Sequence, residues 1–262
     1  MIEQFKTHLD DLCKKSDSSW SRAGLTLIID ESIFKTWLQC QSADAFFEDY
    51  FGKYFSGQTH KSEYGFRYSL SGISIGETFF PLYFSPIKKG EKCIVEAKKT
   101  VKKMESLVRK CAKKQGFTIP NIALSVDGSY NHKDLIAVCE KLKTKTDFIC
   151  VPKKNNIVKI GLFRGNLAKY IEEIFLPAEA DNASDDAFIL RKKGYYKCRD
   201  TEVVFLFFRL NGSKNVSIIY STNLSIKAKT LRRRWFNRTK IEQFFRILKD
   251  TLKVQQSTAV DC

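Results

Sequence analysis

The sequence has little of what membrane-spanning, secreted and zinc-binding proteins need. No stretch approaches the roughly 18 to 20 consecutive apolar residues that cross a bilayer, and the N-terminal MIEQFKTHLDDLCKK lacks the apolar core of a signal peptide. The eight cysteines are scattered without a C-x-x-C pair, and only three histidines are present. Disulfide frameworks and zinc sites are therefore disfavoured. We expect a cytoplasmic protein whose cysteines are reduced and mostly buried.

Acidic residues are also scarce relative to basic ones. Lys and Arg number 45 against 29 Asp and Glu, so the formal net charge is +16. Such an excess favours a polyanionic partner, either nucleic acid or an anionic membrane surface. Nothing resembles an amphipathic membrane anchor, so we expect nucleic acid and no membrane. The basic residues occur in short clusters, which we expect to form one continuous track past the active site: Lys102-Lys103, Lys113-Lys114, Lys153-Lys154, Arg191 to Lys193, and Arg232 to Arg234.

The remaining composition is that of a globular protein, with 43% apolar residues in a chain of 262. Residues 91–115 give the clearest helical signal, because apolar residues recur at steps of three and four and Gly116 follows as a stop. We expect strands at 25–30, 66–74, 78–84, 122–127 and 148–151, and a helix capped by Asn131. Further strands at 157–163, 202–210 and 216–222 would form a mostly β insertion at about 155–226, before a closing helix from about 232 to 254.

This order of elements predicts an α/β fold of the ribonuclease H-like class, a mixed sheet flanked by helices with a β insertion before the last helix. Right-handed crossover of parallel strands restricts the topology severely. In that fold the first and fourth strands lie side by side, so Asp30 and Asp127, which end those strands, would converge. Aspartate is also common after strands because it favours turns, and that alternative stays open for each residue taken alone. We expect residues 1–23 to be an N-terminal segment and 24–262 a single catalytic domain.

The closing helix adds a third carboxylate. With about 100° per residue, one narrow stripe of the helix holds Trp235, Arg238, Glu242 and Lys249. Glu242 borders the apolar face, so packing on the sheet would carry its carboxylate to the edge of the core. Three carboxylates brought together require a cation, and oxygen-only ligands select Mg²⁺ or Mn²⁺. A solvated helix face is the competing explanation for Arg238 and Lys249.

The segment WFNRTKIEQFFRILK resembles the signature of a large group of bacterial insertion-sequence transposases, Tyr-x2-Arg-x3-Glu-x6-Lys. Every spacing is kept by Trp235, Arg238, Glu242 and Lys249, with Trp in the place of Tyr. The motifs Leu-Ile-Ile-Asp-Glu around Asp30 and Val-Asp-Gly-Ser-Tyr around Asp127 resemble the two aspartate motifs of the same group. The resemblance covers about residues 24 to 262.

The resemblance implies a DDE transposase that cuts and pastes an insertion sequence by metal-dependent strand cleavage and strand transfer. Asp30, Asp127 and Glu242 would be the catalytic residues and hold two Mg²⁺ ions, with Mn²⁺ as a substitute. Trp235, Arg238 and Lys249 would bind DNA, the last two by phosphate contacts and Trp235 by base stacking. The implied partners are double-stranded DNA, at transposon ends and target, and a second copy in a synaptic complex at the nucleoid.

Two other functions are consistent with the sequence. Only 29 residues precede Asp30, too few for the N-terminal recognition domain such transposases commonly carry. The chain would then be a catalytically silent, truncated transposase that acts as a DNA-binding remnant or inhibitor. A structure-selective nuclease of the same fold is a third possibility, although it would not need the arginine and lysine at this spacing.

Overall fold

The chain folds as two compact units in the computed structural model, which describes residues 3, 7, 24–35, 45–56, 61–114, 116, 119, 121–181, 188–209, 213 and 215–251. Unit 1 contains Met1–Ile119 and Arg238–Cys262, and unit 2 contains Pro120–Asn237. The expected N-terminal segment, apart from residues 3 and 7, and the end of the closing helix beyond residue 251 lie outside the described residues. In the described part of the chain, no helix is long and apolar enough to span a membrane.

Unit 1 is built on one long strand, β3 (Lys61–Ile75), which pairs antiparallel along both of its edges. One edge binds β1 (Thr26–Lys35). The other edge binds β2 (Phe51–Ser56) and then β4 (Thr78–Pro86). A short helix, α3 (Ala45–Tyr50), precedes β2. β3 and β4 form a hairpin, and Gly76 in the turn between them has a φ of 56°, which favours glycine.

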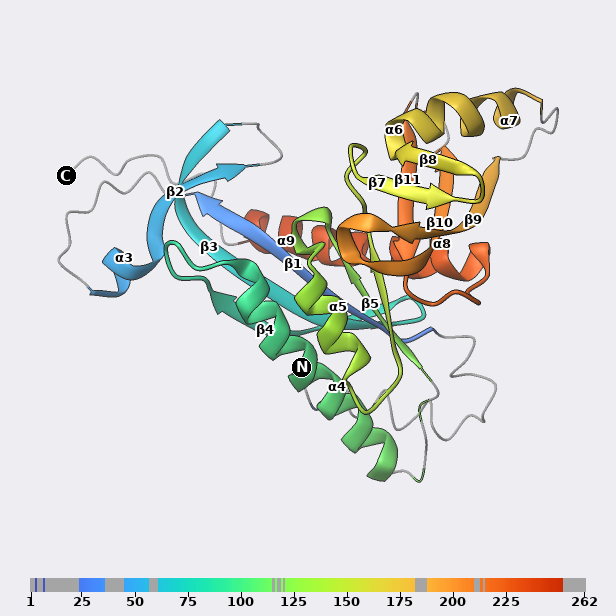
Figure 1. Cartoon of the computed structure of the whole chain (residues 1–262). Helices are drawn as coiled ribbons and strands as arrows, with labels where there is room; N and C mark the ends of the chain where they lie inside the picture. The colour runs from blue at the N-terminus through green and yellow to red at the C-terminus, as the bar shows by residue number, and fades with distance from the viewer. Residues whose placement is uncertain are drawn as a thin grey trace. The chain divides into compact units, whose positions relative to one another are not determined.

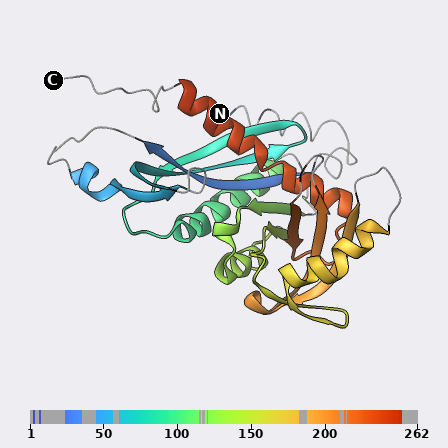
Figure 2. The same ribbon diagram turned by 90° about the horizontal axis from the view of Figure 1, so that it is seen from above.

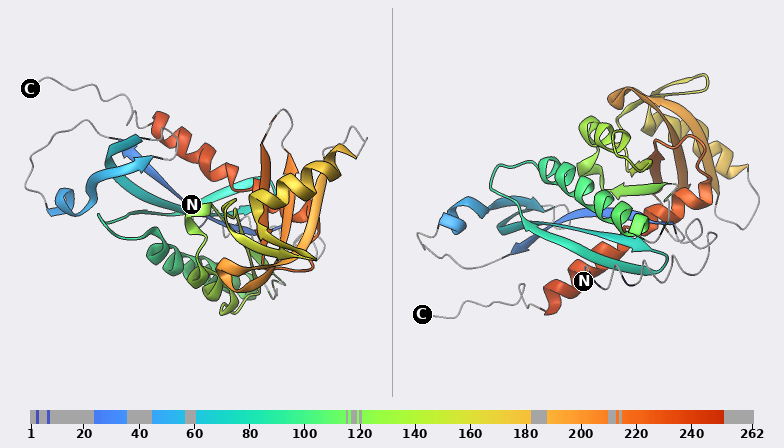
Figure 3. Two further views of the ribbon diagram at one scale, coloured as in Figure 1. Left: turned by 45° about the horizontal axis from the view of Figure 1, so that its top comes forward. Right: turned by 90° about the horizontal axis from the view of Figure 1, so that it is seen from below.

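Two helices cover opposite faces of the unit 1 sheet, α4 (Cys93–Lys114) and α9 (Thr239–Thr251), as Figures 1, 2 and 3 show. On the α9 side, Ile241 and Phe245 pack against Ile28 and Leu70 of the sheet. Burial of the two α9 side chains contributes about 1.5–3 kcal/mol each. On the α4 side, the predicted apolar stripe is buried: Ile94, Ala97, Val101, Met104, Val108 and Cys111. The sequence pattern therefore gave the correct buried face of both helices.

Unit 2 begins with a parallel strand pair, β5 (Ile122–Val126) and β6 (Thr146–Cys150), joined by helix α5 (Lys133–Glu140). Both strands are buried along their whole length, as the apolar runs in residues 122–127 and 148–151 predicted. β6 then pairs antiparallel with β11 (Val216–Ser221), and β11 pairs with β10 (Thr201–Arg209). Helix α8 (Ala228–Phe236) packs on β5, β6 and β10.

The predicted β insertion continues this sheet outward. β10 pairs with β9 (Ile189–Tyr196), β9 with β7 (Ile157–Ile160), and β7 with β8 (Phe163–Asn166), all antiparallel. Two short helices, α6 (Leu167–Tyr170) and α7 (Leu176–Ala180), follow β8 with a π-helical turn between them. The element order and the pairings within each unit confirm the predicted fold class, an α/β ribonuclease H-like mixed sheet with helices and a mostly β insertion.

Several local predictions were wrong. The expected strand 25–30 continues as β1 to Lys35, so Asp30 lies within the strand and does not end it. The closing helix is interrupted between Phe236 and Thr239, so α8 and α9 are separate helices. Asn237 is a poor helix former that favours turns, which is a physical reason for the break. Asn131 does not cap α5; the cap is His132, whose Nδ1 accepts from the backbone N–H of Asp134. The expected strand 157–163 is a hairpin, and β2 and β9 were not predicted at all.

Candidate active site

Asp30 and Glu242 lie together in unit 1, joined by one arginine. Asp30 is on β1, where alternate side chains point to the same face, so it shares the α9 face with Ile28. Glu242 lies in the first turn of α9, next to the buried Ile241. The Arg238 guanidinium, immediately before α9, places Nη1 3.4 Å from Asp30 Oδ2 and Nη2 2.5 Å from Glu242 Oε1. Two of the three predicted catalytic carboxylates therefore share one cation.

This cluster is only partly shielded from solvent. The side chains of Asp30 and Arg238 are 14% and 16% exposed, whereas that of Glu242 is 44% exposed. Asp30 Oδ1 also accepts a hydrogen bond from the backbone N–H of Glu31 at 2.9 Å. Asp30 is consequently fixed in orientation, while Glu242 stands at the edge of the site. Ions and phosphates from solvent can reach such a carboxylate.

The donor chemistry of this cluster fits a hard divalent cation. Asp30 and Glu242 present carboxylate oxygens, which Mg²⁺ and Mn²⁺ prefer, and they already face a common positive group. Among the described residues, no group of three or more His, Cys, Asp or Glu side chains is arranged to hold a metal ion. Asp30 and Glu242 would hold such an ion beside Arg238, which contacts one oxygen of each carboxylate.

Asp127, the remaining predicted catalytic residue, follows β5 in unit 2. Its side chain caps a short 3₁₀ turn and accepts from the backbone N–H of Gly128 at 2.5 Å. Its backbone carbonyl accepts from the thiol of Cys150 at 3.2 Å. Because Asp127 stands at the carboxyl end of a parallel strand pair, it occupies the kind of position at which open α/β sheets place functional side chains. Convergence of all three acids stays a prediction.

A buried polar network lies a few residues beyond Asp127. Asn131 Nδ2 donates to Tyr196 Oη at 3.1 Å and to the carbonyl of Val151 at 3.3 Å, and its Oδ1 accepts from Tyr220 Oη at 2.8 Å. Arg199 Nε donates to the same Oδ1 at 2.7 Å. Burial raises the pKa of Tyr196 to about 12 and raises the pKa of Tyr220 well above its ordinary value. The network ties β6, β9 and β11 to the loop that follows Asp127.

The three predicted DNA-binding residues are found in different settings. Arg238 contacts the two carboxylates described above. Lys249 lies further along α9, with Nζ 5.6 Å from the centre of the Phe34 ring. Trp235 is on α8 in unit 2, where its half-buried side chain packs against the apolar cluster of Ile219 and Leu231. The prediction that one continuous helix carries all four stripe residues was wrong, because the helix is interrupted.

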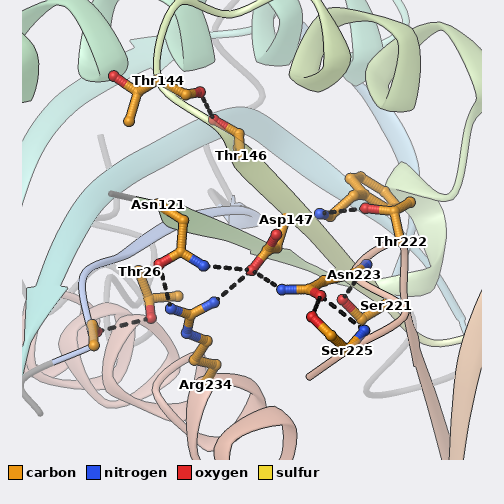
Figure 4. A network of polar contacts seen from close by, with 12 residues as sticks. Thr26, Asn121, Thr144, Thr146, Asp147, Ser221, Thr222, Asn223, Ser225 and Arg234 are labelled. Atoms are coloured by element: carbon orange, nitrogen blue, oxygen red, sulfur yellow. Dashed lines mark hydrogen bonds and ion pairs between the residues drawn. The ribbon is translucent and has the colours of Figure 1, made fainter. Parts of the chain in front are cut away.

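Sequence reasoning missed a second polar cluster, around Asp147 (Figure 4). Its Oδ2 accepts from Arg234 Nη1 at 2.7 Å, from Asn223 at 2.9 Å and from Asn121 at 3.1 Å. The Arg234 and Asp147 side chains are only 7% and 3% exposed. The prediction that Arg234 belongs to a surface basic track was therefore wrong. The available signal was the Asp that directly precedes the apolar run of residues 148–151, because a charge buried at the start of such a strand needs a partner.

No protein-family model matches the sequence, and the comparison with curated proteins gives no match either. Several solved structures are similar. A piggyBac transposase in a synaptic complex with hairpin DNA has a TM-score of 0.41 and 12% identity, over 84% of this chain and 40% of that one. Marinitoga piezophila Argonaute in complex with a guide RNA has a TM-score of 0.36 and 13% identity, over 84% and 26% of the two chains. Ciona intestinalis endonuclease V in complex with DNA has a TM-score of 0.36 and 12% identity, over 88% and 86%. This chain thus spans less than half of the first two proteins.

Proposed function

We propose that this chain is the catalytic part of a DDE transposase, which cuts and joins the DNA of an insertion sequence. The observation that carries the proposal is the placement of Asp30 and Glu242 around one cation, although 208 positions of sequence separate Asp30 from Arg238. Carboxylates that served only to make a helix face polar would not be expected to lie together beside a buried strand. The spacing of Arg238, Glu242 and Lys249, which resembles the transposase signature, gives independent support.

In this proposal Asp30, Asp127 and Glu242 hold two Mg²⁺ ions, or Mn²⁺ in their place. When bound, such ions supply an activated water for the first cut and stabilise the leaving oxygen of the phosphodiester. The protein's own contribution is to orient the ligands. The backbone N–H groups of Glu31 and Gly128 each fix one carboxylate oxygen of the preceding aspartate. The other carboxylate oxygen of Asp30, Oδ2, which Arg238 contacts in this structure, and that of Asp127 would hold the metal ions.

Arg238 and Lys249 would bind phosphates that flank the cut. A guanidinium suits bidentate phosphate binding and an ammonium acts as a compact charge. In the metal-free protein Arg238 neutralises the two carboxylates. With metal ions bound, it would contact a DNA phosphate instead. Trp235 would stack on a base near the end of the element. The substrates would be double-stranded transposon ends and target DNA, held by two copies of the protein at the nucleoid.

Glu242→Gln separates an active enzyme from the other candidates. The substitution keeps size and helix propensity but removes one metal-binding charge, so Mg²⁺- or Mn²⁺-dependent nicking should fall by several orders of magnitude while DNA binding persists. The substrate is a duplex carrying the inverted repeat that flanks the coding sequence, with a recognition domain fused if the flanking DNA encodes one. Asp250→Asn, which changes an exposed carboxylate on the same helix, is the matched control and should cut normally.

The alternative is a catalytically silent remnant that binds DNA and inhibits a full-length transposase. The contacts of Asp30 and Glu242 with Arg238 favour this alternative, because the guanidinium already supplies positive charge that metal ions would otherwise bring. If the wild-type protein binds its transposon end but cuts no faster than Glu242→Gln, this alternative is correct. Normal nicking by the Glu242→Gln variant would instead rule out both the DDE mechanism and its remnant.

A further inference from the structure

A row of aromatic side chains runs along the unit 1 sheet, on the same face as Asp30. The β1–β3 register sets Asp30 opposite Leu70, Ser32 opposite Tyr68 and Phe34 opposite Phe66. Directly opposed residues in an antiparallel pair point to the same face, so this face carries both the carboxylate and the aromatic rings. The members of this aromatic row are Phe34, Phe51, Phe55, Tyr64, Phe66, Tyr68 and Phe84.

Neighbouring rings within the row contact one another. Tyr68 stacks on Phe84 with centroids 4.6 Å apart and an interplanar angle of 7°, and it meets Phe34 edge-on at 5.2 Å. Phe51 stacks on Tyr64 at 6.2 Å and 22°, and also contacts a second ring of the row at 5.5 Å. Offset-stacked and edge-on contacts of this kind hold rings in fixed orientations. The row is therefore ordered along the sheet.

Packing against α9 accounts for the aromatic side chains at only one end of the row. There Phe34 is 6% exposed and contacts Phe245 of the helix, as a core residue does. At the other end Phe55 is 66% exposed and Tyr64 57%. Large apolar side chains grouped on one exposed face mark a binding surface more often than a single exposed residue does. The exposed end is therefore suited to bind a ligand with flat apolar faces.

The lysine ammonium groups on this face indicate which kind of ligand would bind there. Lys53 is opposite Tyr64 in the β2–β3 pair, and its Nζ lies 5.7 Å from the centre of the Tyr64 ring. At the other end of the row Lys249 Nζ lies 5.6 Å from the Phe34 ring. A row of rings with an ammonium group at each end is suited to a polyanion whose flat groups are not stacked on one another. Single-stranded nucleic acid has both properties, whereas the bases of a duplex already stack on each other.

We propose that the exposed end of the aromatic row, formed by Phe51, Lys53, Phe55 and Tyr64, binds unpaired bases of single-stranded DNA. Tyr64 and Phe55 would stack on bases while Lys53 contacts the backbone phosphates. The strand would then run along the face of β3 toward Asp30 and Glu242. That direction rests on the proposed function, because it assigns to the cutting site a substrate whose end is unpaired.

The test compares two oligomers of equal length, fluorescein-labelled oligo(dT) and an abasic strand with the same phosphates, by fluorescence anisotropy at low salt. The variant Phe55→Leu/Tyr64→Leu keeps apolar area but removes both rings. We expect its affinity for oligo(dT) to fall about tenfold or more, since base–aromatic stacking is worth roughly that much or more per base. Affinity for the abasic strand should not change. Tyr64→Phe keeps the ring and should bind oligo(dT) as the wild type does.

Tyr83→Leu is the matched control, because Tyr83 lies on β4 with Lys103 of α4 5.9 Å from its ring, an aromatic–lysine pair on the other face of the same sheet. It should leave oligo(dT) binding unchanged. Circular dichroism melting checks folding, and Phe55→Leu alone, at a 66% exposed position, replaces the double variant if that unfolds.

Two results overturn the stacking proposal: equal losses for the oligo(dT) and abasic strands, or unchanged oligo(dT) binding by the folded variant. A change from dimer to monomer in sedimentation with unchanged oligo(dT) affinity would assign the surface to self-association and also overturn it. These failures leave the proposed transposase function intact if Glu242→Gln still abolishes nicking. Nicking by Glu242→Gln and the ratio of the affinities for oligo(dT) and the abasic strand are independent measurements. Either proposal can therefore fail while the other stands.

Discussion

Two aspartate–arginine pairs, one in each unit, differ in almost every physical respect. In unit 2 Asp147 and Arg234 are 2.7 Å apart, with side chains 3% and 7% exposed, and two asparagines add hydrogen bonds to the same carboxylate oxygen. In unit 1 Asp30 and Arg238 are 3.4 Å apart, more exposed, and Arg238 also contacts a second carboxylate. The two arginines are only four positions apart in the sequence.

The difference separates a structural pair from one that can exchange partners. Removing either member of a buried ion pair leaves a charge away from water and without its counterion, which is costly. A partly exposed pair loses little, because water replaces the missing partner. The unit 1 arginine can therefore leave its carboxylates at small cost, as a metal ion or phosphate arrives. The unit 2 arginine cannot.

The largest expected effect is on Arg234. Arg234→Ala should lower the free energy of unfolding by about 3–5 kcal/mol, because Asp147 is left buried and charged. Urea denaturation of the two proteins measures the difference. Arg233→Ala is the matched control, since Arg233 is the exposed neighbour on α8 and should change stability by less than about 0.5 kcal/mol. A loss below about 1 kcal/mol for Arg234→Ala would show that the two pairs are equivalent.

A smaller effect is expected from the tyrosines around Asn131. The folded pKa of Tyr196, about 12, lies above the ordinary value of 10.0, and burial also raises the pKa of Tyr220. A raised pKa contributes stability below pH 10, and this stability is lost as the pH rises toward about 12. Urea denaturation between pH 9.5 and 12 should therefore show falling stability. Tyr196→Phe removes one ionisable hydroxyl, so its decline should be shallower; an equally steep decline would contradict the assignment.

Arg238 should have the smallest effect on stability and a distinct effect on metal binding. Arg238→Ala should change the free energy of unfolding by less than about 1 kcal/mol. Without the competing guanidinium, affinity for Mn²⁺ should rise about fivefold, the equivalent of about 1 kcal/mol for one charge at this range in a water-like dielectric. Paramagnetic resonance of free Mn²⁺ measures this without an activity assay. Arg246→Ala, at an exposed position on α9, is the control. Unchanged Mn²⁺ affinity for Arg238→Ala would argue against metal binding by these carboxylates.

Much of the fold followed from local patterns in the sequence. The three-and-four spacing of α4 gave its buried face, and the apolar runs before Asp127 and through Phe148 gave buried strands. The β9 strand was missed because Arg191 to Lys193 interrupt its alternation, although Arg191 Nε donates to the carbonyl of Ile226 at 2.7 Å. The break between α8 and α9 was missed because helical periodicity continues across Asn237.

The sequence by itself determined that Asp127 follows a buried strand and which faces of the helices are apolar. Both depend on neighbouring residues, since periodicity is a property of a few consecutive positions. Only the tertiary structure decided the partners of two nearby arginines. Arg234 meets an aspartate 87 positions away and Arg238 meets one 208 positions away. Partners so far apart in the sequence are brought together only by folding, because burial and chain reversal, which no local pattern encodes, decide which charges meet.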